Sequence, residues 1–520
     1  MIDKLPDHYN KIGNRYFKKE QRKKAFHFFQ KALRLNPNYY PAYNNIGLLL
    51  NDIGDFTNAM AYLEQALEFK PYDINHLYNM AFAFENMGNI QQALHYLEKI
   101  IRYYPNFHKA YSALFLDLNY TFTDPKIIYD VHVKWGKQVE SMLTPIKHNN
   151  ENLDLDRIIR VGYISPDFYR HSVSFFFESI LSHHATEKIY TVCYSDCPNN
   201  DDYTKRLRIC ANQWHDCRHM DDETLISLIQ KDRIDILVDL AGHTVNNRLM
   251  VFARKSAPIQ VTYLGYVNTT GLTRMDYRIV DHWTDPFNNE NPHTEKLVRM
   301  PDSFVCYRPP DNSPAVVNAP LLKNGYVTFG SFNEIKKMND STIVLWSAIM
   351  TEVPLSRLYI KCKAFKDEST KEIFFKKFQK HGIKRDRLIF EGFTHSFTDH
   401  LLQYHLIDIG LDTFPYNGTT TTCEALWMGV PIITIKGRNH AGRVGSSLLH
   451  SIGLDEFIAL NDQEYAIKAI SVAQNEKLIV QLRRNLRSMI MNSCLCDATS
   501  FTRSLEYAYR EMWKYYCCSH

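Results

Sequence analysis

The chain has 520 residues and a mass of 61.0 kDa, which is too long for one ordinary hydrophobic core, so we expect about two to four domains. Hydrophobic residues make up 45% of the chain and charged residues 23%, a balance that is typical of a folded globular protein and excludes a disordered one. The formal net charge of only +4 argues against binding to nucleic acid or to a membrane surface through overall charge.

The ends and the cysteines limit the cellular compartment. The first seven residues contain no apolar segment of the kind that a signal peptide needs. No stretch approaches the length of about 18 apolar residues that predicts a membrane-spanning helix. The eleven cysteines are an odd number, which favours reduced thiols. We therefore expect a cytoplasmic protein without membrane insertion, with access to the nucleus if the cell is eukaryotic.

Two short patterns resemble fragments of metal sites. His215, Cys217 and His219 form one, and Cys494 with Cys496 forms the other. Neither has a second pair of ligands at zinc-finger spacing, so the sequence predicts no metal there.

The first hundred residues repeat with a period of 34. A 34-residue period is typical of tetratricopeptide repeats, in which each unit is a pair of antiparallel helices. Small residues allow the two helices to cross closely, Gly54 and Gly88 supply the turn between them, and a proline ends the second helix. The residues that carry the period are Ala25, Ala59 and Ala93, and Pro37, Pro71 and Pro105. The sequence therefore predicts an all-α solenoid of three repeats over residues 1–107.

Stacked helix pairs form a concave groove that usually binds a peptide or a protein. We expect protein or peptide partners in this groove and no nucleic acid. A rigid extension or a dimerisation arm is the alternative, and a homo-oligomer stays open.

A helical neck over residues 108–155 follows, with helices expected over 110–118 and 127–142. Strand-length apolar runs then alternate with helical segments, which indicates parallel sheets covered on both faces. Strands are expected at 160–165, 189–194, 234–240, 259–264 and 277–280, and then at 326–330, 357–361, 388–391, 407–411, 431–435 and 457–459.

These strands predict two α/β halves in tandem. The first half spans residues 156–310 and the second spans residues 325–499, with a linker rich in proline and asparagine at 311–324. Two such sheets leave a cleft in which ligands bind at the carboxyl ends of the strands. A last helix over 500–520 is expected to pack on these domains. Its aromatic face consists of Tyr507, Tyr509, Trp513 and Tyr516.

The segment 411–431 carries the strongest chemical signal. Asn417 and Gly418 allow a tight turn after a strand, and Thr419, Thr420, Thr421 and Thr422 offer hydroxyls and amides where a helix begins. The amides and dipole of a helix N-terminus bind anions, so a diphosphate fits here. Glu424 in the first turn would accept hydrogen bonds from ribose hydroxyls. The alternative is a threonine N-cap with Glu424 as its capping-box partner.

This segment resembles the nucleotide-binding motif of the O-GlcNAc transferase and SPINDLY family of protein glycosyltransferases, glycosyltransferase family 41. The similarity covers nearly the whole chain, and the SPINDLY branch is the nearer one, judging by residues 300–307, 419–424 and 505–513. The chain differs from animal O-GlcNAc transferases in its few repeats and its short linker. Other matching stretches are 165–171, 239–244, 257–266, 329–337 and 440–445.

The resemblance implies a GT-B fold of two Rossmann-like halves and a nucleotide-sugar donor. It also implies inverting transfer to Ser or Thr hydroxyls without a metal or a cofactor. Lys337 matches the essential lysine of the family, and with the helix start at Thr420–Thr422 it would stabilise the departing diphosphate. A surface lysine is the alternative. Asn333 and Glu334, in the same stretch, are expected to contact the nucleotide sugar.

Three polar residues of the first half are candidate catalytic groups. His171 matches a family histidine at the cleft wall and would act as general base or position the substrate. His243 follows a strand at its carboxyl end, where the alternative is a histidine that orders the loop. Asp239 would orient one of these groups. The pattern Asp154-Leu-Asp156 matches a metal-binding motif of other transferases but lies on the neck, so we treat it as a chance match.

The second half carries the remaining candidates for donor binding. His400 matches the family histidine near the nucleotide base, while His440 and Arg443 would hold phosphates or sugar hydroxyls. Phe397 and Gln403 stand where animal O-GlcNAc transferases carry basic residues near the uracil. The donor is therefore left open between UDP-GlcNAc and GDP-fucose.

Two other functions remain possible on the sequence. One is a repeat scaffold whose catalytic half has decayed, and the other is a transferase that acts on a glycan or a small molecule. The presence of Lys337, His171, His400 and Glu424 in their motifs speaks against decay.

Overall fold

The computed structural model describes residues 5–148, 152–288, 291–394 and 396–519. Residues 149–151 of the predicted neck lie outside these ranges. The chain forms two compact units. Unit 1 consists of Met1–Thr121 with Gly330–His395, and unit 2 consists of Phe122–Phe329 with Ser396–His520.

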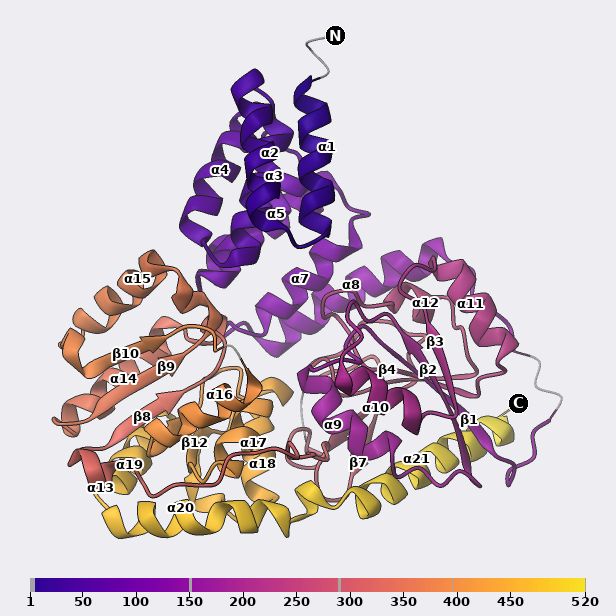
Figure 1. The fold of residues 1–520 in the computed structure, drawn as a ribbon. Helices are drawn as coiled ribbons and strands as arrows, with labels where there is room; N and C mark the ends of the chain where they lie inside the picture. The colour runs from indigo at the N-terminus through magenta and orange to yellow at the C-terminus, as the bar shows by residue number, and fades with distance from the viewer. Residues whose placement is uncertain (1–4, 149–151, 289–290, 395, 520) are drawn as a thin grey trace. The chain divides into compact units, whose positions relative to one another are not determined.

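The N-terminal part of unit 1 consists of antiparallel helix pairs (Figure 1). Ala25, Ala59 and Ala93 are fully buried between them. Gly54 and Gly88 have φ of +87° and +75°, which confirms their expected place in turns that favour glycine. The helices are α1 (Leu5–Lys18), α2 (Arg22–Leu35), α3 (Tyr40–Ile53), α4 (Phe56–Phe69), α5 (Ile74–Asn86) and α6 (Ile90–Tyr103).

The rest of unit 1 joins α7 (His108–Leu118) to part of the second half. The repeats pack directly on this part, because Thr57 on α4 donates a hydrogen bond to Asp367 at 3.1 Å. A Cβ at Gly88 would lie 3.4 Å from Ile335. The elements of this part are η2 (Ile335–Lys337), α14 (Asp340–Glu352), β9 (Arg357–Lys361), η3 (Lys363–Lys366), α15 (Glu368–Gln379), η4 (Arg385–Arg387) and β10 (Leu388–Glu391).

The first half of the α/β region is a seven-stranded sheet with strand order β3-β2-β1-β4-β5-β6-β7. Every pairing in this sheet is parallel, and in β1 Val161 lies opposite Thr191 on one side and Ile236 on the other. The strands are β1 (Ile159–Ser165), β2 (Ile189–Ser195), β3 (Gln213–Asp216), β4 (Ile236–Asp239), β5 (Ile259–Thr262), β6 (Tyr277–Asp281) and β7 (Lys296–Met300). The helices are α8 (Pro125–Met142), α9 (Ser172–Leu181), α10 (Asp202–Cys210), α11 (Asp222–Lys231) and α12 (Leu249–Ala253).

The five predicted strands of this sheet are confirmed, but β3 and β7 were missed. Both lie at the edges of the sheet, where one side of the strand is not covered by a neighbour. Their residues are accordingly mixed polar and apolar, and only Met300 among them is buried. Apolar runs in the sequence mark strands that are buried on both faces, and edge strands such as β3 and β7 have no such run.

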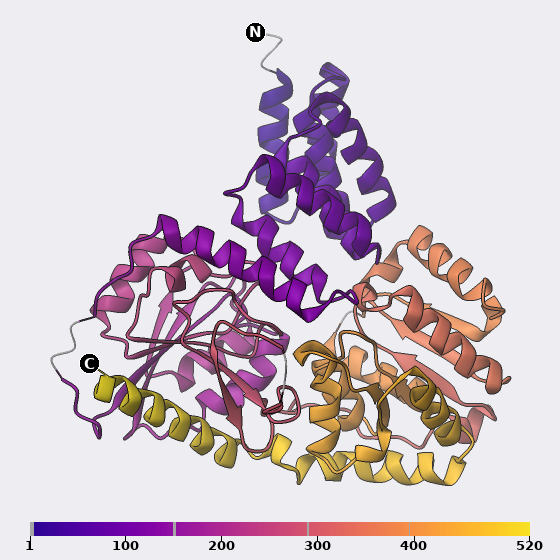
Figure 2. The same ribbon diagram turned by 180° about the vertical axis from the view of Figure 1, so that it is seen from behind.

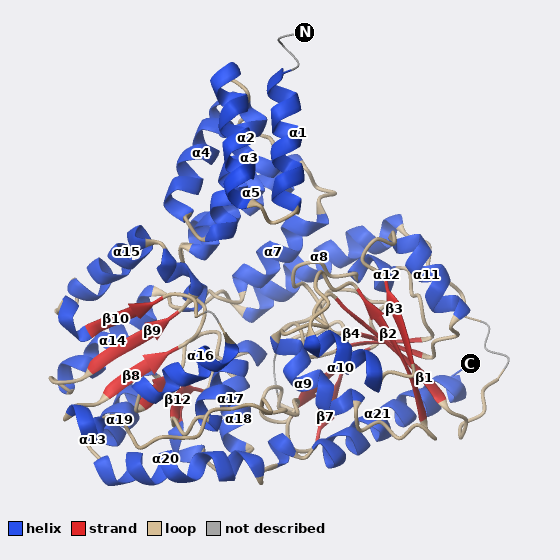
Figure 3. Ribbon diagram, in the orientation of Figure 1, coloured by secondary structure: helices blue, strands red, loops and turns tan. Residues whose placement is uncertain are grey.

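The second sheet has six strands in the order β10-β9-β8-β11-β12-β13, and all six strands expected there are present. Figure 3 shows its strands in red among blue helices. Its other elements are α13 (Leu321–Asn324), β8 (Thr328–Ser331), α16 (Phe397–Leu402), η5 (Gln403–Leu406), β11 (Ile409–Leu411), α17 (Thr420–Trp427), β12 (Ile432–Ile435), η6 (His440–Gly442), α18 (Val444–His450), η7 (Asp455–Phe457), β13 (Ile458–Ala459), α19 (Asp462–Ala473), α20 (Glu476–Met491) and η8 (Cys494–Cys496).

The last helix, α21 (Ala498–Ser519), packs on the first sheet (Figure 2). Its buried residues Leu505, Tyr509 and Trp513 belong to the same hydrophobic core as β1 and β4. Tyr507 does not, because its position on the helix leaves it 68% exposed. The predicted aromatic face is therefore wrong at this residue. Among the helices of the described ranges, none combines the length and the apolar character needed to span a bilayer.

A close approach of backbones joins α8 to the first sheet. A Cβ at Gly136 on α8 would lie 1.9 Å from the carbonyl oxygen of Gly271, and a Cβ at Gly271 would lie 2.3 Å from that of His132. Backbone atoms cannot move aside as the end of a side chain can. Only glycine therefore fits at this crossing.

We predict that Gly136→Ala destabilises the protein, at roughly the 1–3 kcal/mol typical of overpacked sites or above it. Thermal unfolding would detect the change as a lower midpoint. The exposed neighbour Lys137 provides the matched control, because Lys137→Ala removes side-chain atoms on the same helix turn without a clash. Equal unfolding midpoints for the two variants would contradict the claim that only glycine fits where α8 meets Gly271.

Candidate active site

His171 lies at the corner between β1 and α9. It is the N-cap of α9, and its Nδ1 accepts a hydrogen bond of 3.3 Å from the backbone N–H of Val173. In the neutral ring this leaves the proton on Nε2, which makes Nε2 the donor atom of the ring. Burial lowers the pKa of His171 to about 4, so the ring is neutral at pH 7. Both features favour the positioning role over proton abstraction.

Asp167, in the same corner, is a candidate that the sequence reasoning did not single out. Its Oδ1 lies 3.7 Å from Nδ1 of His171. Burial, together with the charge of Asp239, raises the pKa of Asp167 to about 7. A carboxyl that titrates near neutrality suits a general base. Its place just after a strand of a parallel sheet was the available signal.

Asp239 and His243 organise the loop after β4. The Asp239 carboxylate accepts hydrogen bonds from the backbone of Ala241 and Gly242 and from the Thr262 hydroxyl, and burial raises its pKa to about 6. His243 is buried, bonds the carbonyl oxygen of Thr270 at 2.8 Å, and has a pKa lowered by burial to about 4. These contacts support the loop-ordering alternative, and the catalytic role of His243 stays a prediction.

The loop from β11 to α17 is held in shape by Asp412. Its Oδ1 accepts from the Gly418 N–H and its Oδ2 from the Thr434 hydroxyl, both at 2.7 Å. Asn417 donates to the carbonyl of Thr413 and accepts from the N–H of Gly445. The loop thus delivers a helix N-terminus whose first amides have no carbonyl partner within the helix.

The start of α17 is partly exposed. Thr419 is the N-cap but makes no side-chain bond to the helix, and Thr419, Thr420 and Thr421 are partly exposed. Thr422 is buried and donates to the carbonyl of Gly418 at 3.1 Å. These groups are arranged as an anion site would need.

Glu424 is not a capping-box residue, so that alternative is wrong. The helix begins too early in the chain for Glu424 to reach back to its N-cap. Its buried Oε2 instead bonds His400 Nε2 at 2.9 Å and the Tyr404 hydroxyl at 3.1 Å. The ring of Phe397 stacks on His400 at 5.8 Å. His400 and Glu424, predicted separately as donor-binding residues, therefore form one pair.

His440 and Arg443 lie on the turn after β12. The Nδ1 of His440 is 2.6 Å from Asp285, whose other oxygen is 3.5 Å from His293. Burial alone would raise the pKa of Asp285, but the neighbouring His440 and His293 hold it well below its usual range. Arg443 donates from Nε to the carbonyl oxygen of Gly437 at 2.9 Å and is half-buried. Its guanidinium is thus oriented by backbone.

Arg278 on β6 is a second residue that the sequence reasoning missed. It is 2% exposed, and its Nε and Nη1 have no hydrogen-bond partner among the described residues. Burial lowers the pKa of Arg278, and the charges of Asp285 and Glu295 oppose this by raising it. A buried guanidinium with unsatisfied nitrogens is costly. An arginine among the apolar residues Tyr277, Ile279 and Val280 of the strand was the signal for it.

Three predicted residues belong to unit 1. Asn333 is buried and lies 3.4 Å from the Ser331 hydroxyl, and Glu334 is exposed. Lys337 is half-buried at the end of η2, with its backbone N–H bonded to the carbonyl of Glu334 at 3.0 Å. The other predicted site residues all belong to unit 2.

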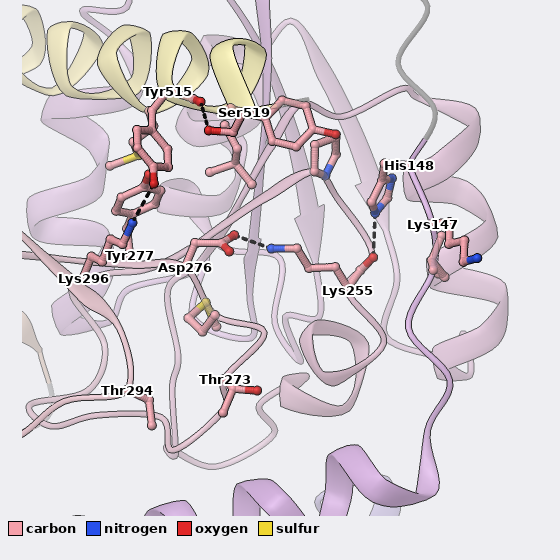
Figure 4. A pocket seen from close by; sticks show the side chains of 16 residues that line it. Lys147, His148, Lys255, Thr273, Asp276, Tyr277, Thr294, Lys296, Tyr515 and Ser519 are labelled. Carbon is pink, nitrogen blue, oxygen red and sulfur yellow. Dashed lines mark hydrogen bonds and ion pairs between the residues drawn. The ribbon is translucent and has the colours of Figure 1, made fainter.

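The described ranges contain no group of three or more His, Cys, Asp or Glu side chains that would hold a metal ion. In the chance motif on the neck, Asp154 accepts from the backbone of Asp156 at 3.0 Å in a local turn. A pocket of about 670 Å³ in unit 2 (Figure 4) is lined by none of the predicted candidates. Its Lys255 is already paired with Asp276.

The fold, with helical repeats followed by two parallel α/β sheets, defines a GT-B protein that carries tetratricopeptide repeats. The family model for glycosyl transferase family 41 matches residues 126–308 and 318–505, and tetratricopeptide-repeat models match residues 7–39, 40–73 and 77–106. The chain therefore belongs to glycosyl transferase family 41.

Relatives and a solved structure agree with this assignment. "Probable UDP-N-acetylglucosamine--peptide N-acetylglucosaminyltransferase SPINDLY" of Hordeum vulgare is 41% identical over 419 residues, which are 79% of this chain and 44% of that protein. The Arabidopsis thaliana protein of the same name is 42% identical over 395 residues, which are 75% of this chain and 43% of its own length. The chain thus spans less than half the length of these relatives.

The structural comparison extends over the whole chain. A mutant of the O-GlcNAc transferase of Thermobaculum terrenum superposes with a TM-score of 0.93 at 31% identity. The match covers 100% of this chain and 99% of that one. The GT-B fold and the resemblance stated from the sequence are confirmed.

The raised pKa of Asp167 leads to a prediction about stability and pH. The folded protein keeps a proton on this carboxyl up to about pH 7, whereas an unfolded aspartate loses it near pH 4. The folded state therefore loses stability as the pH rises through this range. Asn cannot ionise, so between about pH 5 and 8 the unfolding midpoint of Asp167→Asn should fall less than that of the unaltered protein.

The control for this measurement is Asp202→Asn, which removes an exposed carboxylate on α10 instead of a buried one. Parallel curves for Asp167→Asn and the unaltered protein would contradict the raised pKa.

Proposed function

We propose that this chain is an inverting, metal-independent glycosyltransferase that moves a sugar from a nucleoside diphosphate sugar to Ser or Thr hydroxyls of proteins. The observation that carries the proposal is the N-terminus of α17, which Asp412 and Asn417 hold open after β11. Such a terminus binds the diphosphate through its amides and dipole. The His400–Glu424 pair beside it is the proposed contact for the nucleoside.

Transfer without a metal needs positive charge from the protein, because the diphosphate becomes more negative as the sugar leaves. Lys337 is the proposed main source of this charge. Arg443 and the amides of α17 would add to it, and Asn333, Glu334 and His440 would contact the donor. Arg278 is a further source of positive charge, since two of its guanidinium nitrogens have no partner among the described residues.

The acceptor hydroxyl must lose its proton during the transfer. Asp167 is the proposed base, supported by its pKa of about 7. His171 would then position the hydroxyl by donating from Nε2.

The donor is UDP-GlcNAc or GDP-fucose. The names of the plant relatives and the presence of Arg443 favour UDP-GlcNAc. The SPINDLY-like sequence and Phe397 favour GDP-fucose, because Phe397 stacks on His400 where a basic residue would be expected for uracil. We also propose a reducing, cytoplasmic compartment, on the basis of the odd number of cysteines.

Protein acceptors are proposed to bind along the repeats. Asparagines recur there at nearly the repeat period: Asn45 donates to Asn10 at 2.8 Å, and Asn79 donates to Asn44 at 2.9 Å. Such a ladder joins α1, α3 and α5 and offers amide groups to an extended peptide backbone. A ladder of this kind gives affinity without requiring a particular sequence in the acceptor.

The central experiment incubates the full chain with labelled UDP-GlcNAc or GDP-fucose and a protein lysate, with and without EDTA. We expect label on protein with one donor, unchanged by EDTA. Loss of transfer with EDTA would overturn the metal-free mechanism. Nucleotide binding without transfer would favour the scaffold, and label on glycans or small molecules would favour the other alternative.

We predict that Lys337→Ala folds normally and loses turnover by about 100-fold or more, the effect of about 3 kcal/mol of lost transition-state stabilisation. The measurement is kcat with the active donor, and thermal unfolding checks the fold. The nearby exposed residue Glu334 is unsuitable as a control because it is a donor-binding candidate. Lys323→Ala, at an exposed lysine on α13 of the other unit, serves instead. Full turnover by Lys337→Ala would refute the role of Lys337 in stabilising the leaving diphosphate.

We predict that Asn45→Ala and Asn79→Ala raise KM for a protein acceptor by about 2- to 10-fold each, the value of one or two hydrogen bonds. Hydrolysis of the donor in the absence of acceptor should not change. Asn86→Ala is the control, since that amide donates locally to the carbonyl of Phe82. An unaltered KM in both ladder variants would refute acceptor binding along the ladder.

A further inference from the structure

Lys336, the residue just before Lys337, connects the η2 turn to the third repeat. Its Nζ lies 2.7 Å from Oε1 of Glu85 on α5, although the two residues are 251 positions apart in the chain. The side chains are only 23% and 17% exposed. The ammonium group also lies 5.3 Å from the centre of the Tyr120 ring, which favours a cation at this place.

A second carboxyl, that of Asp117 on α7, belongs to the same cluster. It is 1% exposed, and neither of its oxygens has a hydrogen-bond partner among the described residues. Burial and the charge of Glu85 raise the pKa of Asp117 well above its usual range. Of the two carboxyls in the cluster, Glu85 is the one that pairs with the Lys336 ammonium group.

The other end of the turn is fixed as well. Ile335 is 2% exposed. A Cβ at Gly88, in the turn of the third repeat, would lie 3.4 Å from a side-chain carbon and the carbonyl oxygen of Ile335, and also 3.4 Å from the Phe374 ring. The three-residue turn from Ile335 to Lys337 thus has its first two residues packed against the repeats. Its third residue is the proposed catalytic lysine.

We propose that Lys336 and Glu85 are positioning residues, which hold η2 so that Lys337 keeps the place it needs on the leaving diphosphate. The third repeat then contributes to the chemical step in addition to binding the acceptor. This inference rests on the proposed function, because it requires Lys337 to act on the diphosphate. A shift of about 1 Å in such a group costs on the order of 100-fold in rate.

The test uses the full chain and compares Lys336→Met, Glu85→Gln and Lys336→Arg with a charge-reversed pair, Lys336→Glu with Glu85→Lys. For each variant, we measure kcat and KM for transfer, and kcat for hydrolysis of the donor without acceptor. Calorimetry gives the Kd of UDP or GDP, and thermal unfolding gives the unfolding midpoint. The matched control is Thr57→Val, which removes another hydrogen bond between the repeats and the same part of unit 1, at Asp367.

We expect Lys336→Met and Glu85→Gln to lower kcat by about 10- to 100-fold in transfer and in donor hydrolysis alike. The nucleotide Kd and the acceptor KM should stay within about 2-fold. Lys336→Arg and the charge-reversed pair should recover most of the rate. Thr57→Val should affect the unfolding midpoint without changing kcat.

Four results would overturn the inference. The first is a kcat of folded Lys336→Met within about 2-fold of that of the unaltered chain, and the second is a fall in nucleotide affinity that accounts for the lower rate. The third is a fall in kcat of Thr57→Val as large as that of Lys336→Met. The fourth is failure of the charge-reversed pair to fold or to recover the rate. Lys337→Ala separates the two levels of the argument. An active Lys337→Ala, or an unaltered chain that transfers neither donor, refutes the proposed function and the inference with it. A dead Lys337→Ala beside a fully active Lys336→Met refutes the inference alone.

Discussion

The backbone N–H groups at the ends of the buried parallel strands must find hydrogen-bond acceptors, and much of the structure depends on how they do so. Backbone N–H groups beyond a buried strand lose water and need another acceptor. Here the acceptor is repeatedly a buried aspartate at the strand end: Asp239 at the end of β4, Asp281 at the end of β6, and Asp412 just after β11. Each carboxylate takes two or more hydrogen bonds, which offset the cost of burying a charge.

The same aspartates determine where the candidate residues lie. Asp239 fixes the loop that carries His243, and Asp412 fixes the loop that ends in the α17 N-terminus. Asp281 accepts from the backbone of Thr284 and Phe304 and also from the hydroxyl of Ser447 on α18, so it ties the loop before Asp285 to the helix after Arg443. Rigid loops of this kind hold charged groups in place before a ligand arrives, as electrostatic stabilisation requires.

Much of the fold could be predicted from the sequence because its signals are local. The 34-residue period marks the repeats, and apolar runs mark the strands covered on both faces. The edge strands β3 and β7 have no such run. The start of α17 was misjudged as a possible capping box, because the Gly418–Asp412 bond places the helix start and Glu424 turns away to His400 and Tyr404.

The residues missed at the site share a physical reason. Asp167 becomes notable only because burial and the charge of Asp239 raise its pKa, and Arg278 only because its nitrogens are buried without a partner in the described part of the chain. The sequence gives no sign that Lys336 has a role of its own, because its partner Glu85 is 251 positions away and meets it only in the folded chain. Such properties depend on contacts between distant segments, which a single sequence does not display.

The low net charge of +4 is compatible with strong local fields, and two cations of this chain, Lys336 and Arg443, are held in different ways. Lys336 faces a carboxylate, so its charge is largely cancelled and it serves the packing of the turn. Arg443 donates instead to the carbonyl oxygen of Gly437, so the backbone orients its guanidinium. A group that must attract a diphosphate needs the second arrangement, since a carboxylate partner would compete with the ligand for the same charge. The kind of partner that holds a cation therefore separates the residues that shape this site from those that would act in it.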